Sequence, residues 1–314
     1  MDITDYRKLQ HRIRLTVDGQ TPSIQLTSFE DQEAALARVD RSWHLVERFP
    51  FNEAHPDSQK IAHGNETWIA LKRWFLSHHL FIPEVALTGY CLNEVVRAQS
   101  NGEPDQAHYW MDLAVSLRKG CAGLFLYGMD FTPCAGIYDS AIRSNMPEAF
   151  SGFWIRERQN GLLPAMNAFS SSCSTAASNQ LAHSLRSQWA AAEKRYHELH
   201  VQSIYMAVPN GRSKARDYKD LTGKMHEMND PEFDCFDSWF CIDRSPMVTR
   251  LDYVFQVCDV IERLVADLVS GHRLECAIAK DLLNGAKAAM VVFGQWAGPV
   301  SERSAFYPKC MRGE

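Results

Sequence analysis

The sequence predicts a mainly α-helical protein, and three observations support this. From residue 29 onward, apolar side chains recur at intervals of three and four along most of the chain, which is the period of a buried helix face. Alternation of apolar and polar residues, the pattern of a half-buried strand, is confined to the first 28 residues. No internal repeat and no Pro/Gly-rich linker divides the 314 residues, so we expect one helical domain over 1–314.

The first predicted element is a β-hairpin that forms an extension over residues 1–28. Apolar and polar residues alternate over 13–17, Asp18-Gly19 supplies a turn, and Ile24 and Leu26 resume the alternation. Two alternating runs joined by Asp-Gly are typical of a tight hairpin. We therefore expect two short antiparallel strands ahead of the helices.

The predicted helices follow in order, and the first begins at Phe29 with acidic residues in its first turn. The apolar period predicts the others at about 60–81, 84–99, 105–127, 148–168, 176–207, 247–270 and 272–293. Asn101-Gly102 is a typical helix end, and Pro104 suits the first turn of the next helix. Gly271 interrupts an otherwise continuous apolar pattern and separates the last two helices.

One long segment, 209–246, lacks a helical period. It is rich in Gly, Asp, Asn and Pro, yet it carries four aromatic residues: Phe233, Phe236, Trp239 and Phe240. Long irregular segments in compact proteins are usually either functional or disordered, and the aromatic residues favour an ordered segment. We therefore expect an irregular segment that covers the site like a lid.

Charge and composition exclude several classes of protein. With 33 basic and 38 acidic residues the net charge is −5, which argues against a nucleic-acid binder. No run approaches the 18 consecutive apolar residues of a membrane-spanning helix, and the N-terminus lacks the basic and apolar regions of a signal peptide. Nine cysteines, an odd number, fit reduced thiols. We expect a soluble cytoplasmic protein; its oligomeric state stays open, a homo-oligomer included.

The chemistry is assigned to histidines, because the familiar phosphate-binding, zinc-binding and nucleophile-elbow motifs are absent. His78-His79 lie near the end of an aromatic-rich predicted helix. Adjacent helical residues point about 100° apart, so at most one of the two faces a given pocket. This pair is interpreted either as ordinary packing or as a pocket base or substrate contact.

Glu193, His197 and His200 share one face of a predicted long helix, because they are spaced by four and three residues. Such a stripe suits a carboxylate-bridged di-iron site of the helical heme-oxygenase-like type. That site needs further carboxylates from partner helices; Glu66 and Glu84 are available, but no second Glu-x-x-His occurs. A non-heme di-iron oxidase is therefore an alternative, as is a non-catalytic helical binding protein.

His272 and Cys276, directly after Gly271, form the most specific pattern. Positions i and i+4 of a helix lie about 5–6 Å apart at Cβ, close to the distance from a heme iron to the outer carbon of a vinyl group. One helix face would then present an imidazole to iron and a thiol to the edge of the porphyrin. Ala279 and Leu283 continue this face with apolar side chains that suit a flat cofactor.

The stretch Met146–Arg158, which contains Ser-Gly-Phe-Trp-Ile-Arg-Glu-Arg, resembles a Ser-Gly-Phe…Arg segment of the tryptophan 2,3-dioxygenase superfamily. The resemblance implies a helical bundle around a heme. It also implies that Arg156 or Arg158 binds the carboxylate of an amino acid. In that family the heme-ligating histidine follows a little over a hundred residues later, and His272 comes 116 positions after Arg156. The Gly/Ser-rich loop that follows this histidine in the dioxygenases is reduced here to 284–287, which favours hydroxylation over ring cleavage.

His272-x-x-x-Cys276 resembles the heme-attachment motif of the saframycin-type 3-methyltyrosine hydroxylases, in which H-x(n)-H-x-x-x-C holds a heme by one thioether. By that resemblance His272 is the stable axial ligand and Cys276 forms the thioether. His226 would be the labile axial ligand and the acid/base catalyst. Between His226 and His272 lie 45 residues, somewhat more than in the family.

The resemblance implies a heme-dependent monooxygenase or peroxygenase that hydroxylates the aromatic ring of a tyrosine derivative. An example is the conversion of 3-methyl-L-tyrosine to 3-hydroxy-5-methyl-L-tyrosine in the biosynthesis of an antibiotic or another natural product. The oxidant would be hydrogen peroxide, or O2 with a reductant such as ascorbate. The expected partner is a small aromatic amino acid, with no nucleic acid and no membrane.

Overall fold

The structure is a computed structural model that describes residues 12–19, 22, 29–49, 66–130, 142, 155–175, 180–207 and 230–297. Helices dominate this part of the chain, and its regular β structure is one pair of four-residue strands. The predicted fold class, mainly α with a short β element near the N-terminus, is confirmed.

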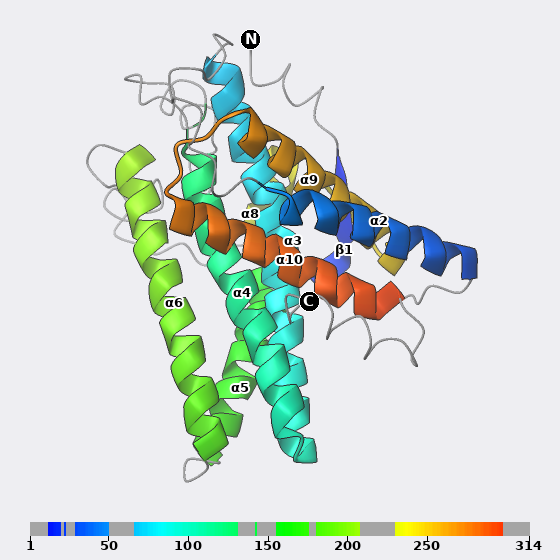
Figure 1. Ribbon diagram of the computed structural model, residues 1–314, viewed down its shortest axis with the longest axis vertical. Coiled ribbons are helices and arrows are strands. Elements are labelled where there is room, and N and C mark those ends of the chain that lie inside the picture. The colour runs from blue at the N-terminus through cyan, green and yellow to red at the C-terminus, as the bar shows by residue number, and fades with distance from the viewer. Residues whose placement is uncertain are drawn as a thin grey trace.

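Two long helices, α3 (Glu66–Asn101) and α4 (Pro104–Gly128), form the centre of the fold. They are joined by a tight turn at the predicted Gly102 and Pro104 boundary. α6 (Gln180–Ala207) packs along α4, while the π-helix η6 (Glu157–Leu162) and α5 (Leu163–Thr175) pack against α3. In Figure 1, α3, α4 and α6 run along the long axis of the molecule.

A second group of helices crosses the first. α2 (Phe29–Glu47) packs against both α9 (Arg250–Ser270) and α10 (Cys276–Ala297), and α10 packs across α4. Figure 1 shows α2 and α10 running across the direction of α3 and α4. Because α10 is enclosed between α2 and α4, most of its residues are buried. None of the helices described is both long and apolar enough to cross a lipid bilayer.

The predicted N-terminal strand is confirmed as β1 (Ile13–Thr16), and it has a partner that the sequence does not predict. β1 pairs in parallel with β2 (Ile242–Ser245), which belongs to the predicted lid segment. The residues of the predicted second strand, Ile24 and Leu26, lie outside the described part of the chain. Asp18 and Gly19 have φ values of 60° and 70°, the left-handed conformation that tight hairpin turns require, so the predicted hairpin itself stays a prediction. Both residues lie in the short turn η1 (Val17–Gly19), which packs against η6.

Part of the segment predicted to be irregular is regular. α8 (Asp230–Trp239) precedes β2, while 209–229 lies outside the described residues. The buried side chains of Phe236 and Phe240 pack on each other, with ring centroids 4.9 Å apart, and Phe240 contacts Phe75 of α3. Burial of these aromatic side chains against α3 therefore orders this segment. α8 is too short to show an extended apolar period in the sequence.

The two helices predicted at about 60–81 and 84–99 are one helix, α3, which continues through Pro83. A proline in a helix interior removes one backbone hydrogen bond and costs about 3 kcal/mol. The residues on both sides of it, among them Ile82 and Val85, are buried. Each buried aliphatic side chain contributes about 1.5–3 kcal/mol, so burial outweighs the cost of the proline.

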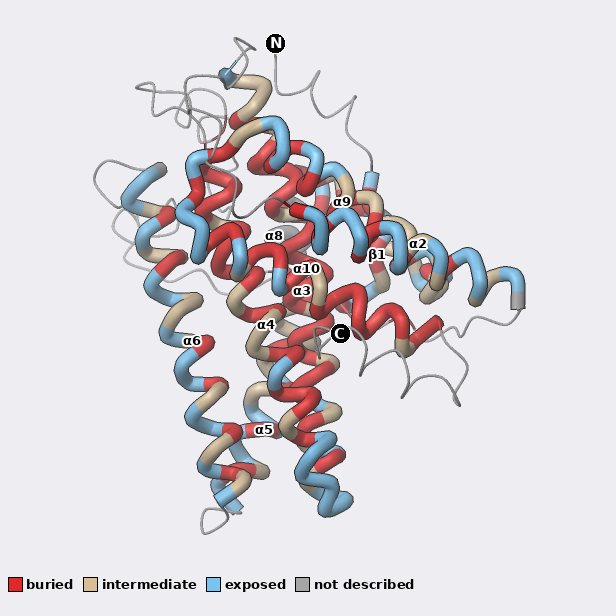
Figure 2. The backbone as a smooth tube through the Cα atoms, in the orientation of Figure 1, coloured by how far each residue is buried: buried red, intermediate tan, exposed pale blue. Residues whose placement is uncertain are grey.

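Buried residues concentrate where α3, α4 and α10 cross, as Figure 2 shows. A Cβ added to Gly120 of α4 would lie 2.7 Å from Cα of Gly285 in α10 and 2.8 Å from Oε2 of Glu84. The two glycines thus allow close helix contact, and the Glu84 carboxyl fills the adjoining space with an exposed fraction of 0%. Burial raises the pKa of Glu84 well above its ordinary value, and the neighbouring Cys121 thiol lowers it only in part.

Candidate functional site

His272 lies in the short connection between α9 and α10. α9 begins at a capping box of Thr249 and Asp252 and ends at Gly271, whose φ of 136° is a conformation that favours glycine. The residues between Gly271 and Cys276 are non-helical, and α10 begins at Cys276. The helix predicted over 272–293 therefore starts four residues later than expected, and helix geometry does not stack His272 on Cys276.

His272 and Cys276 differ in exposure. His272 is buried, with 6% of its surface exposed, and its ring lies beside that of Phe49, with centroids 6.0 Å apart. Cys276 is exposed, and it is the one exposed thiol among the six cysteines whose side chains the structure describes. Ala279 and Leu283, predicted to flank a cofactor, belong to the protein core.

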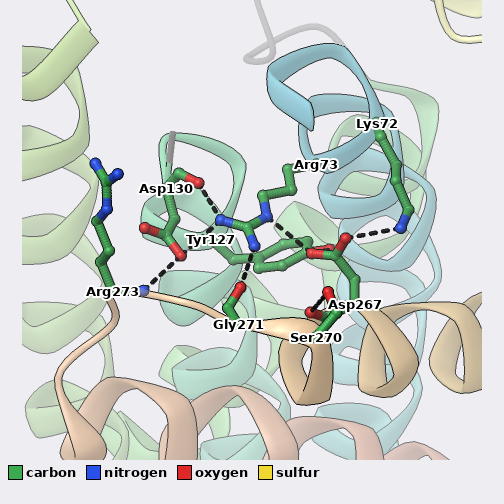
Figure 3. Close-up of polar contacts among 8 residues, drawn as sticks. All are labelled: Lys72, Arg73, Tyr127, Asp130, Asp267, Ser270, Gly271 and Arg273. Atoms are coloured by element: carbon green, nitrogen blue, oxygen red, sulfur yellow. Dashed lines mark hydrogen bonds and ion pairs between the residues drawn. The ribbon is translucent and has the colours of Figure 1, made fainter. Parts of the chain in front are cut away.

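The peptide groups on both sides of His272 are held by a buried ion network, drawn in Figure 3. Arg73 of α3 donates from Nη2 to the carbonyl oxygen of Gly271. The backbone N–H of Arg273 donates to Oδ2 of Asp130, with N and O 2.9 Å apart. Arg73 and Asp130 are themselves joined, because Nη1 of Arg73 donates to the backbone oxygen and to Oδ2 of Asp130. His272 therefore sits between two anchored peptide groups.

Asp267, near the end of α9, adds a second carboxylate to this network. Its Oδ2 accepts hydrogen bonds from Nε of Arg73 at 2.8 Å and from the Tyr127 hydroxyl at 3.0 Å, and its Oδ1 accepts from Lys72 at 2.7 Å. Burial raises the pKa of Asp267, but Arg73 and Lys72 more than reverse this, so the pKa lies below its ordinary value. Burial and the charge of Asp267 raise the pKa of Tyr127 well above its usual range. The phenol thus stays protonated and donates.

Arg73, Asp130 and Asp267 are not among the residues that the sequence predicts for the site, although two signals point to them. Arg73 is a charged residue within the apolar run of α3, and Asp267 lies next to Leu268 within the apolar pattern of α9. Charged side chains are almost never fully buried unless they are paired. A charge at a core position of a predicted helix therefore indicates a buried partner, but it does not identify that partner.

Arg156 precedes η6 and lies among carboxylates. Its guanidinium nitrogens lie 3.2 Å from Asp234, 3.5 Å from Asp18 and 3.7 Å from Asp237. Asp237 also accepts two hydrogen bonds from Arg244, whose guanidinium pairs with the buried Glu157. The positive charge of Arg156 is thus balanced within the protein.

Arg158, two residues further along, lies in a different environment. Burial lowers its pKa, and the positive charge of Arg118 lowers it further, while Tyr196 and Glu193 act in the opposite direction. The guanidinium carbon of Arg118 lies 3.3 Å from the centre of the Tyr196 ring, and its Nη2 donates to Glu193 at 3.2 Å. Two guanidinium groups, one from η6 and one from α4, therefore interact electrostatically.

Glu193, His197 and His200, the predicted alternative metal ligands, have other surroundings. Glu193 binds Arg118, His197 is exposed, and His200 stacks on Phe125, with ring centroids 4.5 Å apart. Burial is the main cause that lowers the pKa of His200 to about 4. Across the described ranges, no group of three His, Cys, Asp or Glu side chains is placed to hold a metal ion.

His78 and His79 both contact Phe240. The His78 ring stacks on Phe240 with centroids 4.1 Å apart, and its Nδ1 donates to the backbone oxygen of Trp74 at 2.8 Å. Nε2 of His79 donates to the backbone oxygen of Phe240 at 2.7 Å. Burial lowers the pKa of His78 to about 3. The pair thus joins α3 to the end of α8, which agrees with the packing interpretation.

Two predicted parts of the site lie outside the described residues. One is His226, the labile ligand and acid/base catalyst implied by the resemblance. The other is most of Met146–Arg158, of which the structure describes 155–158. Both stay predictions.

Comparison with known families gives one match. A family model described as SfmD 3-methyl-L-tyrosine peroxygenase matches residues 8–183, which is more than half of the chain. The matched span includes Arg73, Asp130, Arg156 and Arg158. The three predicted heme contacts lie C-terminal to it. No curated protein matches the chain.

Proposed function

Since the chain belongs to the SfmD 3-methyl-L-tyrosine peroxygenase family, we propose that it uses hydrogen peroxide to hydroxylate the aromatic ring of a tyrosine derivative. The proposed substrate is 3-methyl-L-tyrosine and the product 3-hydroxy-5-methyl-L-tyrosine. In this reaction the O–O bond of the peroxide breaks, one oxygen replaces a ring hydrogen as a hydroxyl group, and the other leaves as water. The family match carries this proposal, because it covers more than half of the chain.

The proposed cofactor is a heme ligated by His272. The chemistry of the available donors fits this group: a buried imidazole lies between two anchored peptide groups, and an exposed thiol follows four residues later. An imidazole is a common axial ligand of heme iron. When bound, the heme would supply the oxidation chemistry that amino-acid side chains lack.

Cys276 is proposed to form a single thioether with a heme vinyl group. The thiol would add across the vinyl double bond, with sulfur on one carbon and hydrogen on the other, so it would need no external oxidant or reductant. The exposed thiol of Cys276 is accessible to this reaction, whereas four other described cysteines are buried: Cys91, Cys121, Cys173 and Cys258. His226 is proposed as the labile second ligand and acid/base catalyst, because histidine changes its charge near neutral pH.

The structure favours Arg158 over Arg156 as the proposed partner of the substrate carboxylate. Three aspartates already surround Arg156, so a further carboxylate there would meet repulsion. Arg158 is half-buried and lies near both the positive charge of Arg118 and the negative charge of Glu193, so an added anion would meet less repulsion there than among three aspartates. A guanidinium also binds a carboxylate through two parallel hydrogen bonds, which fixes the orientation of an amino acid.

Replacing Arg158 with lysine is expected to raise KM for the amino acid about tenfold, because lysine cannot form two parallel hydrogen bonds with one carboxylate. Steady-state kinetics with 3-methyl-L-tyrosine, and with its decarboxylated amine, check this. The amine should lose little further affinity in Arg158→Lys, since it has no carboxylate to bind. If Arg156→Lys raises KM and Arg158→Lys does not, then Arg156 binds the substrate carboxylate.

The proposed function is tested with purified protein, 3-methyl-L-tyrosine and peroxide labelled with 18O. We expect a heme Soret band and one labelled oxygen in the product, and we expect His272→Ala to abolish both. His197→Ala is the matched control, because His197 is exposed, and this variant should keep both. If the labelled oxygen comes from 18O2 with ascorbate and not from peroxide, the oxidant is O2. Two irons per chain without porphyrin, or full activity in His272→Ala, would contradict the proposal.

A further inference from the structure

We infer that Arg73 and Asp130 are positioning residues that fix the direction of the His272 imidazole. The inference rests on the proposed role of His272 as a heme ligand. It starts from a closed ring of contacts. The ring runs from Nη2 of Arg73 to the Gly271 oxygen, along the backbone through His272 to the Arg273 N–H, to Oδ2 of Asp130, and back to Nη1 of Arg73.

This closed ring of contacts replaces the hydrogen bonds that a helix would otherwise provide to the backbone around His272. Metal ligands on helices are held by the backbone bonds of their own turn, but His272 lies in a non-helical connection. Anchoring the carbonyl before His272 and the N–H after it restrains both adjoining peptide planes. The direction of the imidazole then depends on its own side-chain rotation, which the neighbouring Phe49 ring limits.

The location of the charges favours positioning over general stabilisation. Arg73 has an exposed fraction of 1%, and Asp130 and Asp267 are also buried. Buried ion pairs often stabilise a fold no better than apolar residues of similar size, because the charges must be removed from water. All three nitrogens of the Arg73 guanidinium donate, one of them to the peptide group before His272. Such an arrangement supports a ligand that must point in one direction.

The test uses the full chain and two variants of Asp130. Asp130→Ala removes the acceptor of the Arg273 N–H, whereas Asp130→Asn keeps an oxygen at that position. Lys72→Met is the matched control, since it removes an ion pair from Asp267 without touching Gly271 or Arg273. Ile261→Val, at a buried position of α9, is a second control, which shows the effect of lowered stability alone.

Two readouts are measured. Without heme, amide hydrogen exchange at Arg273 and the 15N signals of the His272 ring report on the segment itself. With hemin added, the electron paramagnetic resonance spectrum of the ferric iron reports on ligand orientation. In Asp130→Ala we expect at least tenfold faster exchange, a changed ring signal and several ferric species in place of one. Asp130→Asn should restore most of the native behaviour.

The inference is overturned if Lys72→Met or Ile261→Val, at an equal loss of Tm, alters exchange and the ferric spectrum as much as Asp130→Ala does. Unchanged exchange and an unchanged ring signal in Asp130→Ala would also overturn it. If the unmodified chain takes up no hemin, the proposed function fails. The two measurements without heme still decide whether Arg73 and Asp130 orient His272.

Discussion

Replacing Cys276 with alanine is expected to change a heme that stays with the denatured chain into one that acidified butanone extracts completely. A thioether is a covalent bond and survives unfolding, whereas coordination by His272 is lost when the imidazole is protonated in acid. The measurements are the heme absorbance of the chain after extraction and the mass of the intact protein. The unmodified chain should carry the mass of one heme, and Cys276→Ala should not.

Cys241→Ala is the control for this experiment, because Cys241 is a half-exposed thiol outside the His272 segment. This variant should retain the heme as the unmodified protein does. Complete extraction of heme from the unmodified protein would contradict the thioether. Retention by Cys276→Ala would show that another thiol carries the bond.

Replacing Glu84 with glutamine is expected to remove a pH dependence from the stability of the fold. In the folded chain, burial raises the pKa of Glu84 well above the value that it has when the chain unfolds. Between these two values the folded chain binds one proton more than the unfolded chain. The free energy of unfolding therefore falls by about 1.4 kcal/mol for each pH unit as the pH rises through this window.

Glutamine carries no titrating proton, so Glu84→Gln should gain stability relative to the unmodified protein as the pH rises above about 5. Urea unfolding at pH 5, 6 and 7 measures the difference at each pH. Glu198→Gln is the control, because Glu198 lies at the surface of α6 and pairs only weakly with Lys194, at 3.9 Å. Parallel pH profiles for the unmodified protein and Glu84→Gln would show that Glu84 is ionised in the fold.

Most helices follow from the apolar period of the sequence, and the exceptions have physical causes. Local chemistry marks the turn at Gly102 and the end of α9 at Gly271, and both predictions are confirmed. The break predicted at Pro83 is wrong, because burial along α3 outweighs a local helix breaker. The pairing of β1 with β2 is not among the predictions. A parallel strand in residues 242–245 leaves no local signal near the N-terminus.

The residues of the candidate site likewise fall into those that the sequence predicts and those that it does not. His272 and Cys276 were predicted from a motif, and residue spacing alone assigned them to a helix that begins only at Cys276. Arg73 and Asp130 are not predicted, because their relation to His272 depends on where α3 meets the ends of α4 and α9 in space. The proposed choice of Arg158 over Arg156 also depends on the fold, since only the structure shows that Arg156 lies among aspartates.

The pairing of β1 with β2 has a consequence for how the chain folds. Ile13 pairs with Ile242, so this contact closes a loop that contains most of the protein. Closing so long a loop carries a large entropic penalty, and contacts of this kind slow folding. We expect the two strands to join late, after the helices between them have assembled. A fragment that ends at residue 183 would lack β2, α9 and α10, and we expect it not to fold by itself.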